Sequence, residues 1–310
     1  MTNVPTIATI GNFDGVHPGH KRLVDAVLAE CSRRTSETGR FFEARIFTFS
    51  PHPATLFGCG NFRPICSDGR RSVLLKGLGD LKVSVLTFDK AFAARSADDF
   101  CGELCERYSL AKLFIGYDFH MGSDKAGYAA LAEIAQKRGF ELESVPAVTL
   151  ADGTVIGSSG IRAALEAGDV KRAALLLGRS HMLEGEVVRG DGRGGALLGF
   201  PTANLSEQEC LVPRNGVYAT RCRIIAPQYR EGTKHLEFRG ITNVGTLPTF
   251  RNGSRRTVET HLLDFKEDIY GMHVEIDFLD RIRDEKRFSS VNELKEQISR
   301  DAETRRSFRL

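Results

Sequence analysis

Two histidines, His17 and His20, lie three residues apart in the stretch GNFDGVHPGH, which follows a short apolar run and precedes a helical pattern. In open α/β sheets ligands bind at the carboxyl ends of the strands, and this stretch occupies such a position. Gly11 and Gly15 allow tight turns and close approach of the backbone to a ligand. The start of a helix attracts anions, and imidazoles beside it donate hydrogen bonds to phosphate oxygens as charge develops. The stretch therefore indicates a nucleotide site, with both histidines as catalytic candidates.

The spacing His-x-x-His by itself has two other interpretations. It fits half of a metal site, and it fits polar residues in an ordinary loop. The longer pattern Gly-x-Phe-Asp-Gly-x-His-x-Gly-His is more specific, because every position suits a strand, a turn and a helix start. We therefore keep the nucleotide interpretation and expect Asn12 and Asp14 to shape the loop around the ligand.

A second set of polar residues lies about two hundred residues downstream. The glycine-rich stretch 185–205 offers backbone N–H groups to phosphates, with Gly190 and Gly194 as phosphate-binding candidates. It ends in Pro-Thr-Ala-Asn, where Thr202 and Asn204 alternate onto one face of a strand. A hydroxyl and an amide oxygen on one face can hold Mg²⁺. A flexible loop followed by ordinary strand residues is the plainer alternative.

The stretch TVETHLLDF places Glu259 and His261 on one face of another predicted strand. An acidic residue there either pairs with a neighbouring arginine or accepts a proton from an attacking hydroxyl. The residues alone leave both roles open.

The segment GSSGIRAALEAGDV contains a third candidate group. Ser158 and Ser159 can cap the helix that follows, and Arg162 lies in its first turn. A cation there opposes the helix dipole, so a purely structural role would favour an acidic residue. A bound triphosphate favours arginine, and we interpret this segment as phosphate-binding.

The hydrophobic periodicity separates the chain into two parts. Up to about residue 180, strand-like runs alternate with helical patterns, which predicts a doubly wound parallel sheet. Strands are expected over 6–10, 42–49, 83–88, 112–116 and 140–148. Helices are expected over 19–32, 70–78, 97–110, 128–139, 159–168 and 169–178.

After about residue 180 the period changes to two, which predicts a small antiparallel β-barrel. Its strands are expected over 182–190, 216–225, 235–245, 257–265 and 273–282, and an amphipathic helix over 291–308. The expected fold class is therefore α/β with two domains, residues 1–180 and residues 181–310.

Composition fits an ordinary globular protein, with 310 residues, 41% hydrophobic content and a net charge of +3. The charge balance predicts no nucleic-acid partner, and the absence of a long apolar run predicts no membrane span. Seven cysteines at scattered spacings and no export signal predict a cytoplasmic protein with reduced thiols. Cys101 and Cys105 lie four residues apart among apolar side chains, and we expect both in the core rather than at a metal. Oligomeric state is left open.

The first part of the chain resembles the HxGH-type nucleotidyltransferases, and more narrowly the adenylyltransferase domain of the bacterial bifunctional riboflavin kinase/FMN adenylyltransferases. GNFDGVHPGH, TFSPHPATLF, IGYDFHMG and GSSGIRAALEAGDV carry the resemblance, in order. The resemblance implies catalysis by His17 and His20 and flavin contact by Asp118. It implies nucleotide or phosphate binding by Gly11, Asn12, Phe13, Asp14, Ser158, Ser159 and Arg162. At Asp118 the chain departs from the family, with His120 and Met121 where Arg and Phe are common.

The second part resembles the riboflavin kinase barrel over nearly its whole length. GDGRGGALLGFPTAN, PRNGVYA, GITNVGTLPTF, VETHLLDFKEDIYG and FLDRIRDEKRFSSVNELKEQISRD match in order. The resemblance implies Mg²⁺ coordination by Thr202 and Asn204, a general base at Glu259 and flavin contact by Arg283. In the phosphate loop, GGALLGFP is one residue longer than the family pattern and lacks its second arginine.

The sequence therefore predicts an enzyme with two ATP-dependent activities, phosphorylation of riboflavin to FMN and adenylylation of FMN to FAD. Riboflavin, FMN and ATP are the expected substrates, and Mg²⁺ the expected metal. Two alternatives are a monofunctional relative with one half degenerate and a non-catalytic flavin-binding regulator.

Overall fold

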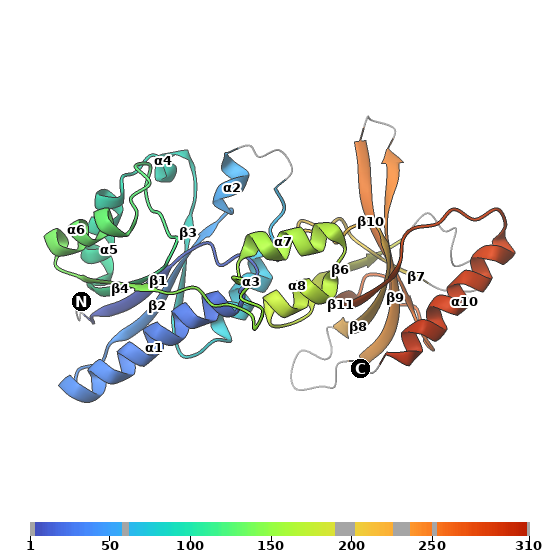
Figure 1. Cartoon of the computed structure of the whole chain (residues 1–310), viewed down its shortest axis with the longest axis horizontal. Coiled ribbons are helices and arrows are strands. Elements are labelled where there is room, and N and C mark those ends of the chain that lie inside the picture. Colours follow the sequence, from blue (N-terminus) through green and yellow to red (C-terminus); the bar gives the residue numbers. More distant parts are fainter. Residues whose placement is uncertain (1–3, 58–61, 190–201, 226–235, 250–252, 309–310) are drawn as a thin grey trace. The chain divides into compact units, whose positions relative to one another are not determined.

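The computed structural model describes residues 4–57, 62–189, 202–225, 236–249 and 253–308 (Figure 1). Its contacts divide the chain into two units, Met1–Ser158 and Ser159–Leu310. Each unit is described by itself.

The first unit is built on a five-stranded parallel sheet in the order β3-β2-β1-β4-β5. Its strands are β1 Thr6–Ile10, β2 Glu43–Ser50, β3 Lys82–Thr87, β4 Leu110–Gly116 and β5 Glu141–Val145. Its helices are α1 Pro18–Thr38, α2 Pro53–Leu56, α3 Asp68–Lys76, α4 Lys90–Ala93, α5 Ala97–Tyr108 and α6 Tyr128–Arg138. The doubly wound parallel sheet predicted from the sequence is confirmed; α2 and α4, each a single turn, were not expected.

Helices cover both faces of this sheet. Ile10 and Phe47 pack with α5 and α6 in one cluster, whereas Ile7 and Ile46 pack toward α1 and α3 in the other two. Every residue of β1 is buried as a result. Cys101 is fully buried in the first cluster and Cys105 packs against it, as expected for core cysteines. Burial raises the pKa of the Cys101 thiol to about 12.

The sheet reverses its strand order beside β1, because β2 lies on one side of β1 and β4 on the other. In an open parallel sheet, such a switch point leaves a crevice at the carboxyl ends of the strands. The loop 11–17 follows β1 at this edge, so the topology places the HxGH stretch where ligands bind.

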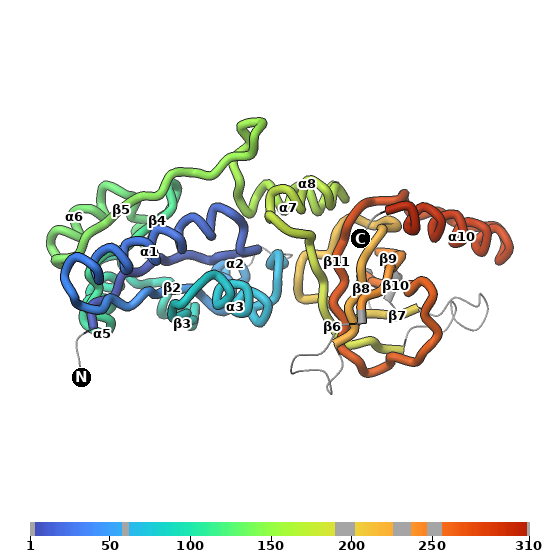
Figure 2. The backbone as a smooth tube through the Cα atoms, turned by 90° about the horizontal axis from the view of Figure 1, so that it is seen from below, coloured from blue at the N-terminus to red at the C-terminus, as the bar shows by residue number. Residues whose placement is uncertain are grey.

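In the second unit the strands form a closed barrel in the order β10-β7-β6-β11-β8-β9 (Figure 2). They are β6 His181–Val188, β7 Thr202–Leu205, β8 Gly216–Ile225, β9 Leu236–Thr249, β10 Gly253–Leu262 and β11 His273–Arg283. All the pairings are antiparallel. Its helices are α7 Ser158–Ala167, α8 Val170–Leu177 and α10 Val291–Ser307. The predicted barrel with a terminal helix is therefore confirmed.

The barrel interior contains a row of threonine hydroxyls. Thr220, Thr242 and Thr260 are fully buried, and each neighbouring pair of Oγ1 atoms is 2.8 Å apart. Mutual hydrogen bonds satisfy these polar atoms away from water. The residues of β10 beside Thr260 therefore point to the outside of the barrel.

Helices α7 and α8 are grouped with the barrel by their contacts, and α8 packs against β6 and β11. Both helices lie within residues 1–180, the expected first domain, because they continue its helical pattern. The division between Ser158 and Ser159 falls after the first residue of α7, so the rest of α7 and the whole of α8 belong to the second unit, whereas the expected domain boundary near residue 180 lies after both helices.

His181, at the start of β6, is expected to make the stability of the barrel depend on pH. Burial lowers the pKa of His181 to about 4, and its Nε2 lies 3.0 Å from the carbonyl oxygen of Leu211. Between about pH 6.5 and pH 4 the unfolded chain binds a proton that the folded barrel does not. The free energy of unfolding is therefore expected to fall by about 3 kcal/mol as pH falls through this range. Denaturant unfolding at a series of pH values measures it.

The matched variants are His181→Gln, expected to lose this pH dependence, and His273→Gln at an exposed position on β11, expected to keep it. An unchanged pH dependence in His181→Gln would assign the effect to other groups.

Candidate functional site

The two histidines of the first unit form a reciprocal cap at the start of α1. His17 is the N-cap residue, and its Nδ1 accepts from the backbone N–H of His20 at 3.4 Å. In return, Nδ1 of His20 accepts from the backbone N–H of His17 at 3.3 Å. The rings stack with centroids 3.6 Å apart and planes at 18°. This arrangement fixes both imidazoles at a helix N-terminus, where an anion is favoured.

The cap also determines where the ring protons reside. Because Nδ1 accepts in both rings, each neutral imidazole carries its proton on Nε2. Both Nε2–H groups are then hydrogen-bond donors. His20 is half-buried and His17 is 7% exposed, so His20 is the more open of the two.

The loop between β1 and the histidines has an unusual backbone. Phe13 and Val16 adopt left-handed φ values of 50° and 43°, which non-glycine residues seldom do. Phe13 is fully buried, and Val16 N–H donates to the Phe13 carbonyl. Asp14 is 3% exposed, and its Oδ1 accepts from the backbone N–H of Ile65 at 2.7 Å. Such backbone conformations persist only where the surroundings hold them, and they cluster at functional sites.

Gly19 lies between the two histidines and leaves room for the His17 ring. A Cβ at this position would lie 3.0 Å from His17 Cε1 and 3.1 Å from its Nδ1. Gly19→Ala is therefore expected to displace the His17 ring and to lower by about tenfold the FMN adenylylation that the sequence resemblance implies. The stability of α1 should change little, because the preference of Ala over Gly in a helix, about 1 kcal/mol, offsets the weakened cap hydrogen bond between His17 and the His20 N–H. Steady-state kinetics and thermal unfolding measure the two effects.

Gly69→Ala is the matched control, because its Cβ would meet only Ser67 Oγ, at 3.9 Å. Equal losses of activity in the two variants would show that the His17 ring does not depend on Gly19.

The other residues assigned to the first site from the sequence lie in the loop after β1, just beyond β4, and in the first turns of α7. Gly11 N–H donates to the Phe47 carbonyl, which fixes the loop where it leaves β1. Ser158 Oγ donates to the Asp14 carbonyl at 2.9 Å, so it holds the same loop. Asp118 is exposed, and it lies two residues after the end of β4, at the carboxyl edge of the sheet. Ser159 and Arg162 lie in the first turns of α7 and are grouped with the second unit. Their ligand contacts stay predictions.

In the barrel, strand register brings the predicted kinase residues together. Glu259 of β10 pairs with Asn204 of β7, and His261 pairs with Thr202. On its other side Glu259 pairs with Asn243 of β9. Directly opposed residues on one face have Cβ atoms about 5 Å apart. A carboxylate flanked by two amides, with a hydroxyl and an imidazole beside them, therefore occupies one face of three strands.

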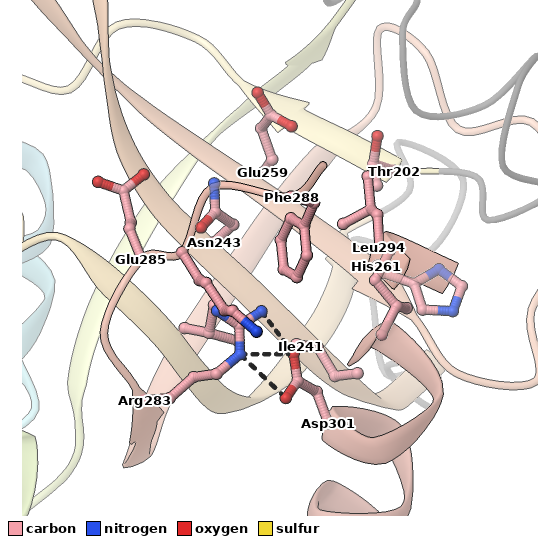
Figure 3. A pocket seen from close by; sticks show the side chains of 13 residues that line it. Thr202, Ile241, Asn243, Glu259, His261, Arg283, Glu285, Phe288, Leu294 and Asp301 are labelled. Atoms are coloured by element: carbon pink, nitrogen blue, oxygen red, sulfur yellow. Dashed lines mark hydrogen bonds and ion pairs between the residues drawn. The ribbon is translucent and has the colours of Figure 1, made fainter. Parts of the chain in front are cut away.

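This face forms one wall of a cavity of about 330 Å³ between the barrel and α10 (Figure 3). Thr202, Asn243, Glu259 and His261 line it from the strands. Phe288, from the segment before α10, lies near its centre, and Leu294 and Ile298 line it from the helix. Ligand cavities of this size combine apolar walls with a few polar groups, as here.

Arg283 lines the same cavity, but its guanidinium is engaged. Nε and Nη2 donate to the Asp301 carboxylate at 2.8–3.1 Å, and Asp301 is 3% exposed on its side chain. Gln297 also donates to Asp301, at 2.9 Å. This ion pair connects α10 to the end of β11. Flavin contact by Arg283 stays a prediction.

The structure describes only part of the expected kinase site and adds one residue to it. Gly190 and Gly194 lie outside the described residues. Asn243, which the sequence analysis did not single out, lines the cavity beside Glu259. In GITNVG, Asn243 lies between Thr242 and Val244, which are both buried, so its side chain belongs to the opposite face of the strand. This placement becomes informative only once the neighbouring strand is known.

Comparison with known proteins finds a family match for each part of the chain. Residues 1–159 match the FAD synthetase family, and residues 177–309 match the riboflavin kinase family. A bifunctional riboflavin kinase/FMN adenylyltransferase of Escherichia coli K12 is 35% identical over 97% of this chain and 92% of its own length. One from Bacillus subtilis is 29% identical over 96% and 90%.

The crystal structure of a protein described as a macrolide-efflux protein from Streptococcus pneumoniae has the same fold. It superposes with a TM-score of 0.85 at 30% identity, covering 100% of this chain and 96% of that one. Among the described residues of this chain, no helix is both long enough and apolar enough to cross a membrane. The motifs, the fold and the identity over nearly the whole length together establish that the chain belongs to the family of bifunctional riboflavin kinase/FMN adenylyltransferases.

Proposed function

We propose that the barrel phosphorylates riboflavin and that the first unit adenylylates the resulting FMN, each with its own set of residues. The observation that carries the proposal is the alignment of Thr202, Asn204 and Glu259 on one barrel face, in a chain that also fixes two histidines at a helix start. ATP is the co-substrate of both reactions.

In the barrel, Glu259 is the general base. It accepts the proton of the ribityl 5′-hydroxyl as that oxygen attacks the γ-phosphorus of ATP and ADP leaves. The amides of Asn204 and Asn243, opposite Glu259 on either side, give the carboxylate polar neighbours. The cavity beside Phe288, Leu294 and Ile298 is the candidate pocket for the flavin ring, because its wall is apolar there.

Thr202 and Asn204 are the proposed ligands of Mg²⁺. The amide nitrogen of Asn204 donates to the Thr202 carbonyl at 3.4 Å, so the amide oxygen takes no part in this hydrogen bond. A hydroxyl and an amide oxygen are hard donors that suit Mg²⁺. When bound, the ion neutralises charge on the phosphates of ATP.

In the first unit, the Nε2–H groups of His17 and His20 donate to phosphate oxygens of ATP. A phosphate oxygen of FMN attacks the α-phosphorus, the bond to the bridging oxygen breaks, and pyrophosphate leaves. Donors fixed in advance stabilise the charge that develops, without reorganising during the step. The reciprocal hydrogen bonds between His17 and His20 hold both imidazole rings in place before the reaction.

Incubation of the purified chain with riboflavin, ATP and Mg²⁺, followed by chromatographic separation of the flavins, tests the proposal. FMN should form first and FAD should follow from it. FMN alone, or FAD only from added FMN, would favour a monofunctional relative. Flavin binding without ATP consumption would favour a regulator. Location in the cytoplasm and the lack of nucleic-acid and membrane partners stay predictions.

A further inference from the structure

Arg71, on α3, is a buried cation that none of the sequence motifs includes. It is 2% exposed and lies in the first turns of the helix, four residues after the N-cap Ser67. A cation near a helix N-terminus opposes the helix dipole, and burial of a charge is costly unless it is well paired. A buried arginine at this position therefore destabilises the fold unless its own contacts compensate for the cost.

The guanidinium of Arg71 connects the carboxyl edges of two neighbouring strands. Nη2 donates to the carbonyl of Phe49, near the end of β2, at 2.6 Å. Nη1 donates at 3.3 Å to the carbonyl of Asn12, in the loop after β1. Asp68 forms an ion pair with Arg71 at 2.9 Å and also accepts from Ser50 at the end of β2. One side chain thus holds both segments to α3.

The orientation of the Asn12 carbonyl affects the course of the loop 11–17, which leads to the two histidines. It also accepts from Thr48 Oγ1 at 3.3 Å, and it directly precedes the left-handed Phe13. With the Asn12 carbonyl directed into the protein, the chain leaves β1 in the direction that leads to His17 at the N-cap of α1. The peptide is planar, so rotation of this carbonyl would reorient the residues that follow.

We propose that Arg71 is a positioning residue of the adenylyltransferase site. It fixes the Asn12 carbonyl, and through it the loop that presents His17 and His20. This inference rests on the proposed role of those histidines in adenylyl transfer. Because Arg71 is only 2% exposed, we expect it to act without contacting substrate, so its loss should lower the rate of the chemical step more than it weakens ATP binding.

The test compares Arg71→Met, Arg71→Lys and Arg71→Gln with Lys76→Met, an exposed cation in the last turn of the same helix. Arg71→Met is expected to lower kcat for FMN adenylylation by about 10²-fold, with the KM for ATP changed less than about threefold. Arg71→Lys, which keeps the charge and can reach a carbonyl, should recover most of the loss. Riboflavin phosphorylation by the same molecules and the Lys76→Met variant should be unaffected.

A double variant separates positioning from general stability. If Arg71 acts through the histidines, adding Arg71→Met to His20→Ala should lower kcat little further. Multiplicative losses, full adenylylation in Arg71→Met, or equal loss of both activities would overturn the proposal. If Arg71→Met does not fold, Arg71→Gln decides by the same criteria, because it keeps one amide donor without the charge. Absence of FAD formation by the unmodified chain would instead contradict the proposed function, and full activity in His20→Ala would contradict the histidine role.

Discussion

Glu259→Gln is expected to lower kcat for riboflavin phosphorylation by about 10³-fold while FMN adenylylation continues at its normal rate. Gln has nearly the same shape, so the pairing of β10 with β7 and β9 is retained. It cannot accept the proton of the attacking hydroxyl, and the oxygen must attack while still protonated. Initial rates of FMN formation from riboflavin, and of FAD formation from supplied FMN, measure the two activities in one preparation.

Glu186→Gln is the matched control, because Glu186 is an exposed carboxylate on β6. It should leave both rates unchanged. Riboflavin phosphorylation within about tenfold of normal in Glu259→Gln would exclude a general base at this position. Loss of both activities in folded protein would contradict their assignment to separate residues.

Much of the first unit could be predicted from the sequence, because its signals are local. The apolar run 6–10 coincides with β1, and the glycines after several helices mark where those helices end. Once alternating strands and helices predict a parallel sheet, the position of the loop after β1 at its carboxyl edge follows from topology alone. The position of the loop that carries His17 and His20 could therefore be predicted without coordinates.

The arrangement of the barrel site could be predicted only in part, because it depends on the register between strands that are far apart in the sequence. Alternation places Thr202 with Asn204 and Glu259 with His261, but it cannot show that Glu259 faces Asn204. Asn243 reaches the site through β9, and Arg71 reaches Asn12 across 59 residues. No local pattern encodes such contacts. The helices α7 and α8 illustrate the same limit, since periodicity identifies a helix but not the unit on which it packs.

His20→Ala is expected to lower FAD formation by about 10²- to 10³-fold and to leave riboflavin phosphorylation unchanged, the reverse of the Glu259→Gln pattern. The substitution removes the Nε2–H donor and also the acceptor for the His17 N–H. His17→Ala should have an effect of similar size and should in addition destabilise α1 by about 1 kcal/mol, because His17 is the N-cap. Rates of pyrophosphate release and thermal unfolding measure the two effects.

His17→Asn distinguishes the catalytic role of His17 from its role as a cap. Asparagine is a preferred N-cap residue, and its side-chain oxygen can accept from the His20 N–H as Nδ1 of His17 does. The variant should therefore recover the stability lost in His17→Ala without recovering FAD formation, because its short amide cannot replace Nε2–H of the imidazole. Recovery of both properties would mean that His17 serves only to start the helix. The chemistry of adenylyl transfer would then depend on His20 and on backbone donors of the loop alone.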